Sequence, residues 1–549
     1  MIAIKKSPWK RVGLGLVTVT SAAILAACGN GNKQTSKDEI NWYTPVDINS
    51  LDISKSTDTY SGIAIGNSGS NLLRVDDKGK PAPDLAKKVE VSKDGLTYTA
   101  TLRKGIKWSD GSAITAKDFV YSWQRMVNPK TASEYSGLAV ESHVKNAKAI
   151  NSGDIKDLNE LGVKADGNKV IFTLESPTPQ MKYLLAFTSF MPQKQSFVDK
   201  VGSKYGTNAK SQIYSGPYTL SGWNGTNGSF KLKKNKYYWN ADKVKIDTIN
   251  FQTVKKPETA VQMYKRGELD TANISNTPAL FKANKGNKDV VDVFEATTAY
   301  MQYNQTGTNK ALANKKIRQA LNYATNRKAY VETAIPTGSR AATGVAPYKL
   351  AKVDGKDLSK YVAPGYTYNA AKAKQLFKEG LQEIGETSVK FTVTSDADSP
   401  VAKSGLDYIK GAWEKALPGL TIEEKFVPFK QRIQDTQNQN FEIVMSLWGG
   451  DYPEGSTFYS NFTTSSPYNG GKFVNSTYDQ AYEKAITTDA LNPTKAAKDY
   501  KAAEKALFDE ANVNPIYFRS TKSLQNPSIK GLIRSSTGLN VDFTYAYKK

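Results

Sequence analysis

The single cysteine of this 549-residue chain, Cys28, stands at the end of an apolar N-terminal segment. Four basic residues between positions 5 and 11 precede an apolar run over residues 12–27, which predicts a secretory signal. The run is short for a membrane-spanning helix, which needs about 20 apolar residues. Because a lone cysteine cannot form a disulfide within the chain, hydrophobic cores must stabilise the body. The length allows two or three domains with such cores.

The residues around this cysteine, Leu25-Ala26-Ala27-Cys28, resemble the lipobox of bacterial lipoproteins. The resemblance implies a signal peptide over residues 1–27 and a lipidated N-terminal Cys28. Residues 28–39 are small, polar and charged, which predicts a flexible tether. The lipid would anchor the protein to the outer face of the cell membrane, since acyl chains contribute about 0.8 kcal/mol per buried CH₂. An ordinary secretory signal with a chance cysteine, or an uncleaved anchor, is the alternative.

The amino-acid composition excludes some classes of function. With His143 as the only histidine, the chain lacks the residues for a zinc site built from histidine or cysteine, and a Ser-His-Asp triad is disfavoured. We therefore predict no metal and no cofactor. The formal charge of +23 comes from lysines spread over the whole length, and export argues against a nucleic-acid partner. A basic surface beside an anionic envelope is the better interpretation.

The first half of the chain is rich in hairpin signals. Alternating residues flank Asp94-Gly95 within 89–102 and Asp166-Gly167 within 163–174, and a third hairpin is expected over 218–232. Thr115, with Asp118 three residues later, predicts the start of a helix that ends before Pro129.

The second half alternates predicted helices and strands, so the expected class is α+β with at least one α/β lobe. The predicted helices cover 314–334, a segment from Asn369 to Gly380, 406–417 and a segment starting at Pro493. The predicted strands are 389–394, 420–427, 441–448 and 515–518. The strand over 441–448 is almost continuously apolar, which indicates burial on both faces.

Several motifs occur together in a characteristic order: Trp108-Ser-Asp-Gly111, Ser215-Gly-Pro-Tyr218, Ile317-Arg-Gln-Ala-Leu-Asn-Tyr-Ala324 and Trp448-Gly-Gly-Asp-Tyr452. The ordered set resembles the dipeptide- and oligopeptide-binding proteins of ABC importers, solute-binding family 5. The resemblance implies a two-lobed fold of the periplasmic-binding-protein type (type II, cluster C) with an extra domain. The implied bounds are 40–69, 196–296 and 521–549 for lobe I, 70–195 for the extra domain and 297–520 for lobe II.

The resemblance also implies a peptide site in the cleft between the lobes. Asp451 matches the aspartate that pairs with the peptide ammonium, although a turn residue before Tyr452 is the alternative. Leu447, Trp448, Gly449 and Gly450 would bind the peptide backbone, and Trp448 could instead fill a core. Thr57 and Thr59 would approach from lobe I, unless this segment is only an ordinary strand end.

No lysine or arginine lies between Thr436 and Asp451, where some relatives bind the ligand carboxylate. Arg432 and Arg519 are the possible substitutes, and we expect tolerance of longer peptides. Arg318 is interpreted as a structural ion-pair partner.

The implied function is the capture of oligopeptides outside the cytoplasm and their delivery to membrane-embedded ABC permease subunits with cytoplasmic ATPases. The protein would act as a monomer and not as an enzyme. A dedicated peptide-pheromone receptor is one alternative, as is binding of a sugar or a nickel complex. An envelope peptidase that uses serine and lysine is the alternative from another class, although no S-x-x-K with supporting motifs is evident.

Overall fold

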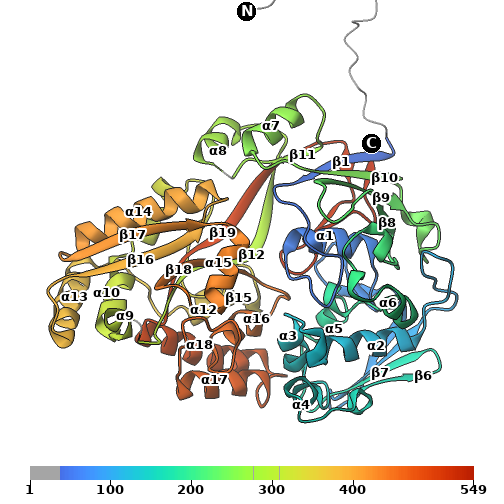
Figure 1. The fold of residues 1–549 in the computed structure, drawn as a ribbon, viewed down its shortest axis with the longest axis horizontal. Coiled ribbons are helices and arrows are strands. Elements are labelled where there is room, and N and C mark those ends of the chain that lie inside the picture. The colour runs from blue at the N-terminus through green and yellow to red at the C-terminus, as the bar shows by residue number, and fades with distance from the viewer. Residues whose placement is uncertain (1–36, 276, 308) are drawn as a thin grey trace, which may run out of the picture. The chain divides into compact units, whose positions relative to one another are not determined.

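The computed structural model describes residues 37–275, 277–307 and 309–549. The predicted signal peptide, Cys28 and the tether up to residue 36 lie outside the described residues. Within the described part, no helix combines the length and apolarity that crossing a membrane requires. The secondary structure is mixed, as predicted, and three separate sheets carry most of the strands (Figure 1).

The first sheet has four strands in the order β1-β10-β9-β8. Their bounds are β1 (Glu39–Thr44), β8 (Tyr218–Ser221), β9 (Ser229–Lys234) and β10 (Thr248–Thr253). The hairpin predicted over 218–232 is confirmed as β8 and β9. The core beneath this sheet collects residues from distant parts of the chain, among them Trp42, Tyr218, Phe251 and Phe543. Helix α1 (Thr59–Ser68) contributes Ile63 and Ile65 to the same core.

A second, antiparallel sheet has the order β4-β5-β7-β6. Its strands are β4 (Ala86–Val91), β5 (Thr97–Leu102), β6 (Val163–Asp166) and β7 (Lys169–Thr173), so both predicted Asp-Gly hairpins are confirmed. Helix α2 (Ala116–Val127) begins at the predicted capping box, in which Asp118 Oδ2 accepts a hydrogen bond from the Thr115 backbone N–H (2.7 Å). Trp123 of this helix stacks on Phe190 in the core.

The third sheet is the largest, with the order β11-β19-β12-β18-β16-β17 and β13 paired to β19. Its strands are β11 (Thr271–Asn273), β12 (Val290–Tyr303), β13 (Arg340–Ala341), β16 (Val389–Asp396), β17 (Leu420–Val427), β18 (Ile443–Gly449) and β19 (Val513–Gln525). The predicted apolar strand is confirmed as β18, which lies in the middle of the sheet with Ile443–Ser446 buried. The predicted strand 515–518 is part of the longer β19, which pairs with β12 along most of its length.

Helices cover this third sheet. Figure 1 shows α10 (Lys315–Ala324), α13 (Ala370–Ile384) and α14 (Pro400–Ala416) beside β16 and β17. The helix capped by Asn369 continues through Gly380 and ends at Gly385, which adopts the left-handed conformation, so the predicted end was wrong. A Cβ at Gly380 would lie 2.6 Å from Ile317 Cγ1, so this glycine allows α13 to pack closely on α10.

The single helix predicted over 314–334 is interrupted. After α10 the chain forms α11 (Arg327–Ala329) and a π-helical turn over Tyr330–Ala334. Arg318 has a structural role, but its closest partners are carbonyl oxygens of Leu312, Ala313 and Glu510 instead of a carboxylate.

The remaining helices and strands are shorter or lie around these sheets. The helices are α3 (Ser136–Glu141), α4 (Ala147–Ser152), α5 (Met181–Leu184), α6 (Gln195–Val201), α7 (Pro257–Lys265), α8 (Pro278–Asn284), α9 (Lys310–Ala313), α12 (Leu358–Val362), α15 (Phe429–Gln437), α16 (Ser456–Tyr459), α17 (Ser476–Ile486) and α18 (Pro493–Glu510). The short strands are β2 (Leu73–Val75), β3 (Pro81–Pro83), β14 (Lys352–Val353), β15 (Lys356–Asp357), β20 (Ile529–Lys530), β21 (Ile533–Arg534), β22 (Val541–Asp542) and β23 (Tyr547–Lys548).

Two glycines of α14 test how tightly this helix is packed. A Cβ at Gly405 would overlap the buried hydroxyl end of Tyr330, whereas Gly411 faces open space. We expect Gly405→Ala to lower the free energy of unfolding by about 1–3 kcal/mol through overpacking. Gly411→Ala, the matched control, should raise it by about 0.5–1 kcal/mol. Urea unfolding followed by fluorescence measures both changes, and equal effects of the two substitutions would contradict the described packing.

Candidate functional site

The third sheet has an open backbone edge at the end of β18. Strand β18 runs parallel to β16 but pairs with it only through Ile443 and Val444. Beyond Val444 it keeps only its antiparallel partner β12, which pairs with residues 443–449. On the side away from β12, residues 445–449 therefore have no strand partner among the described residues. Unpaired N–H and C=O groups of this kind can accept an additional strand.

Gly450 and Asp451 directly follow this edge. The Gly450 N–H donates to the Ala296 carbonyl oxygen (2.8 Å), and the Gly450 carbonyl accepts from the Gly538 N–H (3.3 Å). The Asp451 N–H donates to Thr457 Oγ1 (3.0 Å). These bonds hold Asp451 at the carboxyl end of β18, on the side of the sheet where α/β proteins commonly bind ligands.

The Asp451 carboxylate is half-buried among hydrogen-bond donors and aromatic rings. Tyr135 OH donates to Oδ1 (3.2 Å), and Thr457 Oγ1 lies 3.5 Å from Oδ2. Burial raises the pKa of Asp451 to about 7, although both hydrogen bonds oppose the shift. Burial, together with the charge of Asp451, also raises the pKa of Glu141, at the end of α3, to about 8. A cation placed here would favour the charged form of Asp451.

The other predicted residues of this segment differ in exposure. Leu447 and Trp448 are partly buried, Gly449 is exposed and Gly450 is buried. The Trp448 indole N–H donates to the Thr457 carbonyl oxygen (2.7 Å), and its ring packs on Tyr468 with centroids 4.7 Å apart. Because only part of the Trp448 ring is covered, this side chain combines features of a core residue with those of a residue that lines an open site.

Thr57 is linked to the Asp451 carboxylate through the Glu134-Tyr135 segment. Thr57 Oγ1 donates to the Glu134 carboxylate (3.0 Å), and the next residue, Tyr135, reaches Asp451. Tyr468 OH donates to the Glu134 carbonyl oxygen (3.0 Å). Thr59 is exposed at the start of α1, which is capped by Asp58, so this segment is a helix N-terminus and not a strand end.

Both arginines considered for a carboxylate clamp are already paired. Arg432 Nε lies 2.6 Å from Asp396 Oδ1, and Arg519 forms an ion pair with Glu295. Arg432 also donates to Ser446 Oγ (3.2 Å) and is buried.

Sequence reasoning missed the residues that surround Asp451 from other segments, namely Tyr135, Glu141, Thr457 and Tyr468. Tyrosine occurs 30 times in the chain, so no single one stands out. Phe187 packs edge-on against Tyr135 with centroids 5.5 Å apart. No local pattern marks these residues, because only the tertiary structure brings them together.

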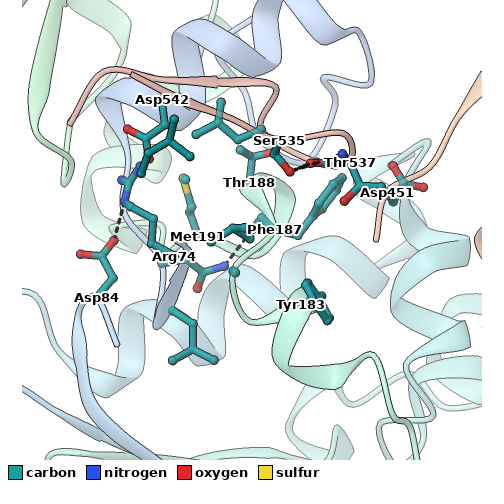
Figure 2. Close-up of a pocket in the computed structure, with 17 residues that line it drawn as sticks. Arg74, Asp84, Tyr183, Phe187, Thr188, Met191, Asp451, Ser535, Thr537 and Asp542 are labelled. Carbon is teal, nitrogen blue, oxygen red and sulfur yellow. Dashed lines mark hydrogen bonds and ion pairs between the residues drawn. The ribbon is translucent and has the colours of Figure 1, made fainter. Parts of the chain in front are cut away.

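Figure 2 shows a pocket with Asp451 at one end, across from Arg74 and Asp84. The cavity volume of this pocket is about 30 Å³, which is enough for roughly two water molecules. At its other end, Arg74 pairs with Asp84 (3.1 Å) and Asp542 (2.9 Å), so these three charges are satisfied within the protein. This pocket is too small for a peptide and differs from the open edge of β18. Within the described residues, no group of three or more His, Cys, Asp or Glu side chains is arranged to hold a metal ion.

Comparisons with known proteins agree with this architecture. A model of the bacterial extracellular solute-binding proteins, family 5 Middle, matches residues 80–470. The chain is 44% identical to a dipeptide-binding protein of Lactococcus lactis subsp. cremoris, over 98% of this chain and 99% of the relative. It is 30% identical to the oligopeptide-binding protein OppA of Bacillus subtilis, over 99% of this chain and 100% of the relative.

A solved structure of Listeria monocytogenes OppA bound to peptide is similar to the whole described body. It superposes with a TM-score of 0.86 at 33% identity and covers 94% of this chain and 100% of that one. The predicted two-lobed binding-protein fold and the resemblance stated from the motifs are both confirmed.

Proposed function

The chain belongs to the bacterial extracellular solute-binding proteins of family 5, and from this premise we propose that it binds peptides in a cleft beside β18 and delivers them to an ABC-type permease. The observation that carries this proposal is the open edge of residues 445–449, which ends at the half-buried carboxylate of Asp451. A peptide that adds to this edge as a further strand forms backbone hydrogen bonds that do not depend on its side chains. Such a site can therefore accept many sequences.

Asp451 would bind the peptide ammonium, the one charge that every unmodified peptide carries at its start. Tyr135 and Thr457 contact its carboxyl group, and burial raises its pKa, so an ammonium would enter a partly desolvated site and favour the charged form of Asp451. Charge-assisted hydrogen bonds contribute roughly 1.5–3 kcal/mol in such surroundings. Exposed Gly449 leaves room for a second backbone, while Thr57, Thr59, Leu447, Trp448 and Gly450 would complete the cleft.

The lobe division implied by the motifs is part of the proposal: 40–69, 196–296 and 521–549 in lobe I, 70–195 in the extra domain and 297–520 in lobe II. Each of the three sheets has a hydrophobic core of its own, which supports this division. Tyr135 of the extra domain and Asp451 of lobe II would then meet across the cleft. Strands β12 and β19 cross the proposed boundary between the lobes, and rotation of the lobes about these strands would open and close the cleft.

The proposal predicts that peptides copurify with the protein. After expression of residues 29–549 and denaturation, mass spectrometry should identify a mixture of short, intact peptides. One dominant peptide would instead favour a dedicated pheromone receptor. A sugar, a metal complex, or peptides that are cleaved on incubation would contradict the proposal, and cleavage would support the peptidase alternative.

Removal of the Asp451 charge should weaken peptide binding. We expect Asp451→Asn to lower affinity about 10–100-fold, which corresponds to the energy of one charge-assisted bond. Wild-type affinity should fall between pH 7.5 and 5.5, because protonation near the raised pKa of about 7 removes the charge. The variant should change less over that range. Isothermal titration measures each affinity.

An N-acetylated copy of the peptide is the control for this anchor. It should bind the wild-type protein about as weakly as the free peptide binds Asp451→Asn. If neither the acetyl group nor the substitution changes affinity, the ammonium lies elsewhere.

We also infer that Cys28 carries a lipid that holds the protein on the extracytoplasmic face of the membrane. The support is the Leu-Ala-Ala-Cys motif and the absence of any other cysteine. Cys28→Ser should abolish incorporation of labelled palmitate in the producing cell and release the protein from membranes. Labelling that persists in the variant would contradict this inference.

A further inference from the structure

The open edge of β18 is bounded at its far end by one ion pair. Strands β16 and β18 separate after Thr394 and Val444, which are opposite each other. The Arg432 guanidinium, from α15, spans the gap beyond them, with Nε at 2.6 Å from Asp396 Oδ1 and Nη1 at 3.2 Å from Ser446 Oγ. Another strand therefore has room beside β18 only between Ser446 and Asp451.

The spacing of these two ends limits how much peptide the edge can hold. Ser446 precedes Asp451 by five residues, which corresponds to about 16 Å of extended chain. A peptide whose ammonium lies at Asp451 would therefore bring its fourth or fifth residue level with Asp396. A shorter peptide would end before this point, and a longer one would have to leave the edge there.

The charge at the far end is unfavourable for a carboxylate. The Arg432 side chain is 4% exposed and that of its partner Asp396 is 13% exposed, so the anion is the more exposed group of this pair. Asp398 follows two residues later, on the exposed turn after β16. A ligand carboxylate that ended here would meet Asp396 without access to the arginine.

The other arginine near the edge is also neutralised. Arg519 pairs with Glu295, whose second oxygen accepts a hydrogen bond from Thr521 Oγ1 (3.0 Å). Arg340 is exposed, but its guanidinium stacks on the Tyr348 ring. Arg340 belongs to β13, which lies three strands away from β18. Three strand spacings amount to about 14 Å.

We propose that the Arg432–Asp396 pair is a length-dependent specificity element that disfavours peptides of four or five residues with a free C-terminal carboxylate. This inference rests on the proposed function. Shorter peptides end before the pair, and longer ones pass it as neutral backbone, so both classes tolerate a free carboxylate or an amide equally. Peptides of four or five residues bind better as amides.

The test is a ladder of polyalanine-type peptides of two to eight residues, each made as free acid and as amide, titrated at pH 8. For four and five residues we expect the amide to bind about 3–10-fold more tightly than the acid. At the other lengths the two forms should agree within about twofold. An acid that binds tenfold more tightly than its amide at any length would overturn the proposal, as would equal binding at every length.

Asp396→Asn tests the assignment to this pair, because the variant leaves Arg432 without its carboxylate. The preference for the amide at four and five residues should be lost, because no carboxylate at position 396 repels that of the peptide. Glu423→Gln is the matched control, since it removes an exposed ion pair with Lys390 from the same sheet. An unchanged preference in folded Asp396→Asn would overturn the assignment. If that variant does not fold, the wild-type ladder decides alone.

N-acetylated peptides separate this inference from the proposed function. If acetylation abolishes binding but acids and amides never differ, the peptide site stands and the length element is wrong. If no peptide of the ladder binds in either form, the proposed function itself fails.

Discussion

The structure around the candidate site depends on the point where β18 leaves β16. Backbone N–H and C=O groups in a protein interior need hydrogen-bond partners, and β18 has them on both sides only up to Val444. Beyond it, one side is supplied by β12 and the other is left open. Arg432 occupies the start of the gap and Asp451 lies at its end. The positions of the proposed backbone contacts and of the ammonium-binding carboxylate follow from the length of this unpaired edge.

The electrostatics of the edge work against the stability of the protein without ligand. Asp451 and Glu141 are two carboxyl groups partly removed from water, so burial raises the pKa of both, and the charge of Asp451 adds to the shift of Glu141. A site built for binding often keeps such unfavourable groups, because their removal would improve stability and weaken function. With no disulfide available to the body, the large cores beneath the three sheets must compensate. The buried Trp123 and Trp413 illustrate how much apolar surface they contain.

Sequence patterns predicted the parts of this fold that local physics determines. Asp94-Gly95 and the Thr115 capping box act within a few residues, and the structure has both as expected. The end of α13 was predicted wrongly, because Gly380 is needed for contact with Ile317 and not for a turn. For the site, the motif located Asp451 but gave no indication of Tyr135, which is 316 residues away. Contacts of this kind depend on the packing of whole domains, and a single sequence carries no local signal for them.

No basic residue lies between Thr436 and Asp451, and the nearby Arg432 is already paired, so the described residues of the edge offer no free cation to a ligand carboxylate. A free cation at the far end of the edge would select one peptide length, because the fixed ammonium and carboxylate would have to span one distance. Here the cation is buried behind Asp396, so a match in length brings no gain. Selection by length then acts through repulsion at one position and is absent elsewhere. Affinity would come from the backbone and the ammonium, which are common to all unmodified peptides, and this combination is suited to a protein that captures mixtures.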